Sequence, residues 1–182
     1  ATMHWMENRS AERSNIHNYY PNAKSVISVG LNYFTGTTTT SEDVGKISNY
    51  AWGDDYNDII KPRLYQLLNQ IKSIDPKIDG IVCVDTSPIM EKDWAQKSGL
   101  GWIGKHTNLI TQEFGSWIFL GELLLNIELQ YNNPFTEDLC GTCTACLDAC
   151  PTNAFPEPYV LDSSKCISYL TIEHRNHFSN IM

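Results

Sequence analysis

Basic residues and long apolar runs are both scarce in this chain of 182 residues. Lysine and arginine number 13 against 21 aspartates and glutamates, which gives a net charge of −8. No run of basic residues is present, so the chain lacks the phosphate-neutralising surface on which broad, nonspecific nucleic-acid binding depends. No apolar stretch approaches the length of a membrane span, and no secretory signal opens the chain. We therefore expect neither membrane contact nor general nucleic-acid binding by these residues alone.

Cysteine is also scarce outside one short segment, because only Cys83 and Cys166 lie elsewhere. The segment 140–151 reads CGTCTACLDACP, and its C-x2-C-x2-C-x3-C-P spacing is typical of bacterial iron–sulfur proteins. Zinc is the alternative, but zinc sites usually pair two C-x2-C hooks that lie far apart in sequence. A thiol-rich metal motif with few other cysteines favours a reducing cytoplasm over a secreted disulfide scaffold. The pattern therefore predicts a cytoplasmic iron–sulfur protein.

The spacing assigns the cysteines to two [4Fe–4S] clusters. Cys140, Cys143 and Cys146 are the predicted ligands of one cluster. Cys150 precedes a proline and is expected to reach the second cluster. Cys166 is either a buried thiol on an apolar stretch or a partner of Cys150 on that second cluster. Two cubane clusters take about eight thiolates, so we expect further cysteines in a longer protein of which this chain is a part.

Strand and helix patterns alternate before the cysteine segment. Pro62 lies inside the longest helical pattern, so the regular helix is predicted to begin near it. The predicted elements are strands 25–34 and 80–84, helices 56–71 and 90–97, and paired strands 108–110 and 116–120 joined by a turn. Residues 130–139 are a predicted linker. This order predicts an α/β (α+β) domain over residues 1–130 and a ferredoxin-like iron–sulfur module over residues 131–182, incomplete at its C-terminus.

Residues 99–104, GLGWIG, match the dinucleotide pattern G-x-G-x-x-G. A dinucleotide fingerprint follows a strand and opens a helix, whereas the pattern here follows a helical segment and leads into a strand. We favour instead a loop whose glycines let the backbone approach a large, flat group. Trp102 is either a stacking partner of that group or a core residue.

Asp85 comes at the C-terminal end of an apolar strand, where α/β proteins place reactive groups. A partly desolvated carboxyl there has a raised pKa and can donate a proton near neutral pH. The alternative is an ordinary N-cap of the next helix. Lys105, His106 and Asn108 cluster after the glycine loop, either as ligands or as satisfied surface groups. Cys83 is predicted to be a small buried hydrophobe.

Five segments resemble epoxyqueuosine reductase, the family that performs the last step of queuosine synthesis in transfer RNA. In the family's order they are YAWGDDYNDIIKPRL, VDTSPIMEKDWAQKSGLGWIGKH, GSWIFLGELLL, CGTCTACLDACPTNAF and LDSSKCISYLTIEHR. The resemblance implies a cobalamin-dependent reductase that removes the epoxide oxygen of epoxyqueuosine at the tRNA wobble position. It also implies that cobalamin is held without an axial base, and that two [4Fe–4S] clusters feed electrons to the cobalt.

The resemblance also implies roles for particular residues. Asp85 is the implied proton donor to the leaving oxygen, and the glycine loop with residues 105–109 is implied to line the corrin ring. The implied cobalamin contacts are Arg9, Ser48, Asp85, Lys105, Asn108, Leu109 and Ser168. The implied partners are tRNA with a queuosine-type anticodon and an electron donor, and we expect a monomer.

Two parts of the family pattern are missing from the chain. The family continues past the TIEHR stretch with a second cysteine motif and a helical repeat region that helps to grip tRNA. We therefore expect the chain alone to be inactive and unable to assemble either cluster in native form. Three alternatives share part of the motif set: a ferredoxin-like electron carrier, another corrinoid enzyme such as a reductive dehalogenase, and a zinc-binding interaction module.

Overall fold

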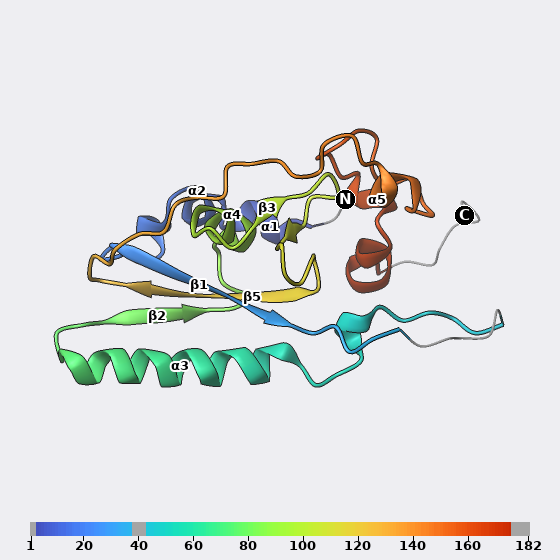
Figure 1. Ribbon diagram of the computed structural model, residues 1–182. Helices are drawn as coiled ribbons and strands as arrows, with labels where there is room; N and C mark the ends of the chain where they lie inside the picture. The colour runs from blue at the N-terminus through green and yellow to red at the C-terminus, as the bar shows by residue number, and fades with distance from the viewer. Residues whose placement is uncertain (1–2, 38–42, 176–182) are drawn as a thin grey trace.

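A three-stranded sheet forms the centre of the molecule in the computed structural model, which describes residues 3–37 and 43–175 (Figure 1). Its strands are β1 (Ser25–Asn32), β5 (Ile118–Leu125) and β2 (Gly80–Cys83), in the order β1-β5-β2. β5 is antiparallel to both neighbours, so β1 and β2 run in the same direction. The C-terminal ends of β1 and β2 therefore lie at one edge of the sheet, beside the start of β5.

The long helix α3 (Tyr56–Ile74) covers one face of this sheet (Figure 1). Its buried residues Ile60, Leu64 and Leu68 recur at helical spacing and pack against the strands. The prediction that the helix begins near Pro62 is wrong. Asp55 caps the helix by accepting a hydrogen bond from the Asn57 N–H (2.8 Å), and Pro62 lies within the helix. The cap and the buried face outweigh the interior proline, which costs about 3 kcal/mol.

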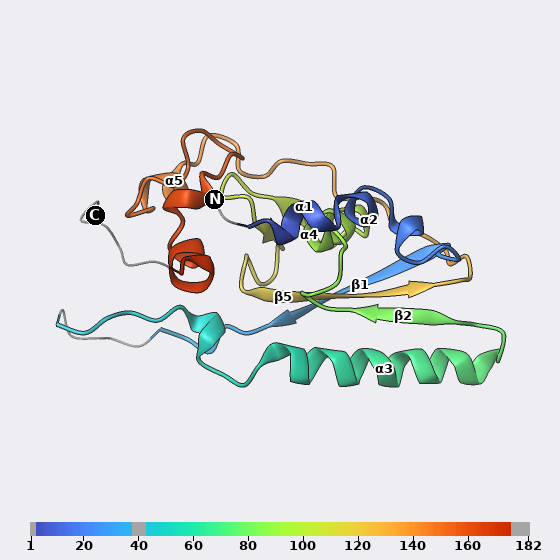
Figure 2. The ribbon, with the colours of Figure 1, turned by 180° about the vertical axis from the view of Figure 1, so that it is seen from behind.

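The other face of the sheet is covered by short helices (Figures 1 and 2). They are α1 (Trp5–Asn8), α2 (Ser10–Ser14), the 3-10 turn η1 (Ile16–Asn18) and α4 (Glu91–Lys97). The core on this side includes Tyr20, Ile89 and Leu124. Cys83 belongs to the same core and is fully buried, which confirms the prediction of a small buried hydrophobe. Burial raises the pKa of its thiol to about 11.

The predicted pairing of strands 108–110 and 116–120 is wrong. β4 (Leu109–Ile110) pairs instead with β3 (Trp102–Ile103) in a separate two-stranded sheet. β5 spans both the predicted strand 116–120 and the apolar run that follows it, and it pairs with β1 and β2. Only an isolated bridge between Thr111 and Gly115 joins the two sides of the predicted turn. The buried, apolar β5 is the central strand of the larger sheet, and this long-range pairing outweighs the local hairpin pattern.

The C-terminal part contains short elements only: α5 (Ala145–Asp148), η3 (Ser163–Lys165) and the π-helix η4 (Tyr169–Glu173). The predicted linker contains no helix or strand, but it is attached to the α/β part. The Phe135 N–H donates to the Gln96 carbonyl (2.9 Å), and the Tyr131 hydroxyl donates to the Lys24 carbonyl (3.0 Å). The boundary at residue 130 stays a prediction. Among the described residues, no helix is long and apolar enough to cross a membrane.

Candidate functional site

Asp85 lies on the loop that leads from β2 to α4, at the edge where β1 and β2 end. Its backbone is in the left-handed region (φ 55°), and its side chain is exposed. Its N–H donates a hydrogen bond of 2.6 Å to Oε1 of Glu91, the first residue of α4. The partial burial predicted for Asp85 is therefore wrong. The N-cap alternative is wrong too, because Met90 occupies that position.

Aromatic side chains gather at the same edge of the sheet. Tyr56 stacks on Phe119, with ring centroids 4.2 Å apart, and Tyr33 packs on Phe119 at 4.4 Å. Phe34 and Trp117 meet at 4.9 Å, and both are exposed. Burial raises the pKa of Tyr56, and the nearby carboxylate of Asp85 raises it further. The exposed carboxyl thus stands beside a neutral phenol and an aromatic surface.

Two acids lie behind this edge, and the sequence analysis did not identify either as functional. Glu122 in β5 is fully buried, and neither of its carboxyl oxygens has a hydrogen-bond partner among the described residues. Burial, with the charge of Glu91 as a smaller cause, raises the pKa of Glu122 to about 9. Burial also raises the pKa of Glu91 to about 7. The one sequence signal for Glu122 was its place as an acid inside the apolar run IFLGELLL.

The glycine loop follows helix α4 and leads into strand β3, so the arrangement of a dinucleotide fingerprint is absent here. The predicted close approach exists, but the neighbour is the chain itself. A Cβ at Gly101 would lie 2.0 Å from the carbonyl oxygen of Ile110, and one at Gly99 (φ +81°) would lie 2.7 Å from the carbonyl oxygen of Asn133. These glycines therefore permit internal packing.

The residues after the glycine loop hold the cysteine segment. Lys105 is buried, and its ammonium donates to the carbonyl oxygens of Gly141 (2.5 Å) and Cys143 (2.9 Å). The indole N–H of Trp102 donates to the sulfur of Cys140 (3.4 Å). Trp102 also stacks on Phe135 of the linker and is buried, so it is a core residue as one alternative proposed.

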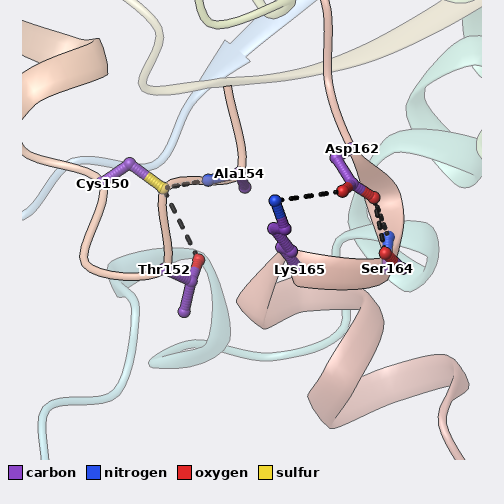
Figure 3. Close-up of polar contacts among 6 residues, drawn as sticks. All are labelled: Cys150, Thr152, Ala154, Asp162, Ser164 and Lys165. Carbon is purple, nitrogen blue, oxygen red and sulfur yellow. Dashed lines mark hydrogen bonds and ion pairs between the residues drawn. The ribbon is translucent and has the colours of Figure 1, made fainter. Parts of the chain in front are cut away.

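Cys150 is held by hydrogen bonds from its own turn (Figure 3). The Ala154 N–H donates to its sulfur (3.3 Å), and the Thr152 hydroxyl lies 3.6 Å away. These contacts, chiefly the Ala154 N–H, lower the pKa of the thiol. A sulfur that accepts N–H bonds suits a thiolate ligand of an iron–sulfur cluster. Nearby, Asp162 bonds to Ser164 and pairs with Lys165 (Figure 3).

The six cysteines are all unpaired thiols. Within residues 3–37 and 43–175, no group of three or more His, Cys, Asp or Glu side chains is poised to hold a metal ion. The assignment of individual cysteines to clusters therefore stays a prediction.

Comparison with known proteins identifies the family. A family model described as epoxyqueuosine reductase QueG, DUF1730, matches residues 13–86, and one described as a 4Fe-4S double cluster binding domain matches residues 139–182. The epoxyqueuosine reductase of Synechocystis sp. is 49% identical over 176 residues, which are 96% of this chain and 60% of that protein. The chain is similar to epoxyqueuosine reductases over nearly its whole length. It spans about 60% of the length of this family member.

Solved structures of epoxyqueuosine reductases share the fold. One was determined with a tRNA-Tyr epoxyqueuosine-modified stem loop; it superposes with a TM-score of 0.78 at 34% identity, over 85% of this chain and 42% of that one. The Bacillus subtilis reductase, with the loop of its catalytic aspartate swung out of the active site, has a TM-score of 0.76 at 30% identity. That match covers 89% of this chain and 44% of the Bacillus subtilis chain.

The contacts expected from the epoxyqueuosine reductase family are spread over several elements. Arg9 forms an ion pair with Glu12 (3.2 Å) and lies over the ring of Tyr19. Ser48 and Ser168 are both exposed and stand just before η2 (Asn49–Ala51) and η4.

The other expected contacts lie after the glycine loop. Leu109 is buried in β4, and the exposed Asn108 accepts a hydrogen bond from the ammonium of Lys92 (3.3 Å). His106 contacts the Ser116 hydroxyl (3.0 Å), and burial lowers the pKa of its imidazole. Lys105 is directed toward the cysteine segment.

A cavity of about 820 Å³ lies between the start of β1, helix α4 with the loop after it, and residues 129–134. Within the part of the chain that the structure describes, none of the seven expected cobalamin contacts of the reductase family lines this cavity or the smaller one beside it. Asp85 in particular is not on its wall. The roles of these residues as cobalamin contacts stay predictions.

Proposed function

We propose that this chain carries the proton donor and part of the electron-transfer apparatus of an epoxyqueuosine reductase. The supporting observation is the attachment of the cysteine segment to the α/β part through Lys105 and Trp102. An electron-carrying segment and an exposed strand-end carboxyl thereby belong to one assembly. Family membership supports epoxyqueuosine in tRNA as the substrate.

The reaction consumes two electrons and two protons. The epoxide oxygen leaves as water, and a carbon–carbon double bond forms between the two carbons that carried it. The proposed role of Asp85 is to deliver a proton to the departing oxygen. Its exposed side chain can reach a substrate, and the main-chain bond to Glu91 fixes the loop from which it projects.

The electrons are proposed to arrive through [4Fe–4S] clusters. Cys140, Cys143 and Cys146 would hold one cluster, while Cys150 and Cys166 would contribute to another. The N–H bonds to the sulfurs of Cys140 and Cys150 fit this role, because such bonds stabilise thiolate charge. The electron donor is proposed to be a separate redox partner.

Cobalamin is proposed as a further cofactor on the family resemblance alone. No step of the reaction is assigned to the corrin. The tRNA is proposed as the macromolecular substrate, as one relative was solved with a modified stem loop. The charge of −8 means that basic surfaces outside these residues must supply most of the tRNA affinity. A cytoplasmic monomer is proposed.

Replacing Asp85 with asparagine tests the function. In the full-length protein, Asp85→Asn is expected to lower the rate of epoxyqueuosine reduction by about 100-fold or more, because a positioned acid contributes about that factor. The product is measured by mass spectrometry of nucleosides from a modified stem loop. Asp93→Asn, which removes an exposed charge from α4, is the matched control and should leave the rate unchanged. An unchanged rate in Asp85→Asn would exclude the proposed role.

Iron content provides a second test. After anaerobic incubation with iron and sulfide, the 182-residue chain is expected to hold clearly fewer than about eight irons. The reason is that only five cysteines lie in and after the cysteine segment, whereas two cubane clusters need about eight thiolates. Iron and sulfide are quantified chemically and the clusters by visible absorption. A full complement of iron would contradict this expectation, and one equivalent of zinc without visible absorption would support the zinc alternative.

A further inference from the structure

One side chain of helix α4 bonds to the main chain of the loop that carries Asp85. We propose that Glu91 is a positioning residue, whose carboxylate holds the main-chain N–H of Asp85 and thereby keeps the Asp85 side chain at the edge of the sheet. The Oε1···N distance is 2.6 Å. Loss of this bond would release the loop. The inference rests on the proposed function of Asp85, but the hold itself can be measured without any enzyme activity.

The local backbone explains why a hold is needed. Asp85 is a non-glycine residue at φ 55°, a conformation that costs roughly 1–2 kcal/mol. Tight turns surround it, since the Thr86 N–H bonds back to the Val84 carbonyl (2.6 Å) and the Ile89 N–H to the Ser87 carbonyl (2.9 Å). A charge-assisted bond contributes more than a neutral one and can offset the strained conformation.

The surroundings of Glu91 fix its carboxylate under this N–H. The ionisable groups that act on it or respond to its charge are Asp85 of the loop, Lys92 of α4, Cys83 of β2, Glu122 of β5 and Tyr56 of α3. Glu122 has a strongly raised pKa, so at neutral pH it is protonated and does not repel the Glu91 carboxylate. The pKa of Glu91 is raised to about 7. Its carboxylate therefore gains a proton as the pH falls below neutrality, and the hydrogen bond to the Asp85 N–H loses its charged acceptor.

A relative supports the idea that this loop has two positions. In the Bacillus subtilis reductase, the loop of the catalytic aspartate was found swung out of the active site. A single hydrogen bond between the loop and the first residue of the next helix can break and re-form. The bond from Asp85 to Glu91 is made by the main chain of Asp85.

Hydrogen–deuterium exchange of the Asp85 amide tests the proposal in the full chain. Glu91→Leu removes the acceptor and should speed exchange at Asp85 by about tenfold or more, because a bond to a charged acceptor is lost. Glu91→Gln keeps an acceptor oxygen of the same reach but not the charge, so its exchange should lie between that of the natural chain and that of Glu91→Leu. Glu91→Asp withdraws the carboxylate by one methylene and should exchange faster than Glu91→Gln. Asp93→Asn, in the same helical turn, should change nothing.

The possible outcomes distinguish the hydrogen bond between Glu91 and Asp85 from its role in the reaction. Glu91→Leu and Glu91→Asp amides as protected as the natural one would overturn the proposal. If Glu91→Leu fails to fold, the order of Glu91→Asp and Glu91→Gln decides alone. In the full-length protein, Glu91→Leu should lower kcat while leaving KM for the stem loop nearly unchanged, and Glu91→Gln should restore most of kcat. Fast exchange with no loss of kcat would overturn Glu91 as a positioning residue, whereas the role of Asp85 itself is decided by Asp85→Asn.

Discussion

Replacing Glu122 with methionine is expected to stabilise the fold, and to do so much more at about pH 8 than at about pH 5. The carboxyl of Glu122 is fully buried without a hydrogen-bond partner among the described residues. Burial raises its pKa from 4.5 to about 9. Above pH 4.5 the unfolded chain releases the proton that the folded chain retains, so stability falls as the pH rises toward 9.

The size of this effect follows from the difference between the pKa values of Glu122 in the folded and the unfolded chain. Each pH unit in that window lowers the free energy of unfolding by about 1.4 kcal/mol, so the gain from methionine should grow by a few kcal/mol between the two conditions. Urea unfolding at both pH values measures it. Glu128→Met, at an exposed position just after β5, is the matched control and should not stabilise the fold as Glu122→Met does. An equal gain for Glu122→Met at both pH values would mean that Glu122 is ionised in the fold.

A buried carboxyl at position 122 with no hydrogen-bond partner in the described part of the chain lowers the stability of the fold, so we expect Glu122 to serve a purpose other than stability. Glu122 faces Ser28 of β1 and Cys83 of β2 in the strand register, on the side of the sheet covered by α4. Removing the carboxyl of Glu122 should therefore change the surroundings of the Glu91 carboxyl on that side of the sheet. The Glu122→Met chain is expected to be more stable, and yet to position the Asp85 loop less well. Such a trade between stability and function is typical of active sites.

The sequence predicted the elements whose patterns are local. Apolar spacing located α3, β1, β2 and α4 within a few residues, because each buries one face against a neighbour that the pattern implies. It placed the start of α3 wrongly because the cap by Asp55 outweighed the signal of Pro62. It paired β4 wrongly because β5 pairs with β1 and β2, which lie far away in the sequence, while β4 pairs with the nearby β3. Register and pairing need tertiary information that periodicity lacks.

The candidate site shows the same limit. Asp85 was identified because its place after an apolar strand is visible in the sequence. Glu91 was missed since its role depends on a main-chain bond across six residues, and Glu122 because its significance comes from the absence of a partner in the folded chain. The glycine loop was recognised as a close approach, but only the fold shows that the chain itself fills the space. The role of Lys105 as a cofactor contact stays a prediction, and the bonds of its ammonium to the cysteine segment were not visible in the sequence.

Replacing Lys105 with methionine should release the cysteine segment from the α/β part. Methionine keeps an unbranched side chain one atom shorter than that of lysine but donates no hydrogen bond, so both bonds, to Gly141 and Cys143, are lost. Hydrogen bonds that involve a charged group contribute about 1.5–3 kcal/mol each, and the loss should therefore lower the local stability of residues 139–146 by at least about 3 kcal/mol. The core between the sheet and α3 does not include Lys105, so its melting temperature should change little.

Two measurements check this expectation. Amide exchange in peptides covering residues 139–146 should accelerate by about 100-fold, and iron uptake after anaerobic incubation should fall. Lys165→Met is the matched control, because its ion pair with Asp162 (3.5 Å) is exposed and contributes roughly 0–1 kcal/mol (Figure 3). Unchanged exchange and iron uptake in Lys105→Met would show that Trp102 and the linker suffice to hold the segment. The attachment through Lys105 would then carry no weight in the proposed electron transfer, and Asp85 alone would support the function.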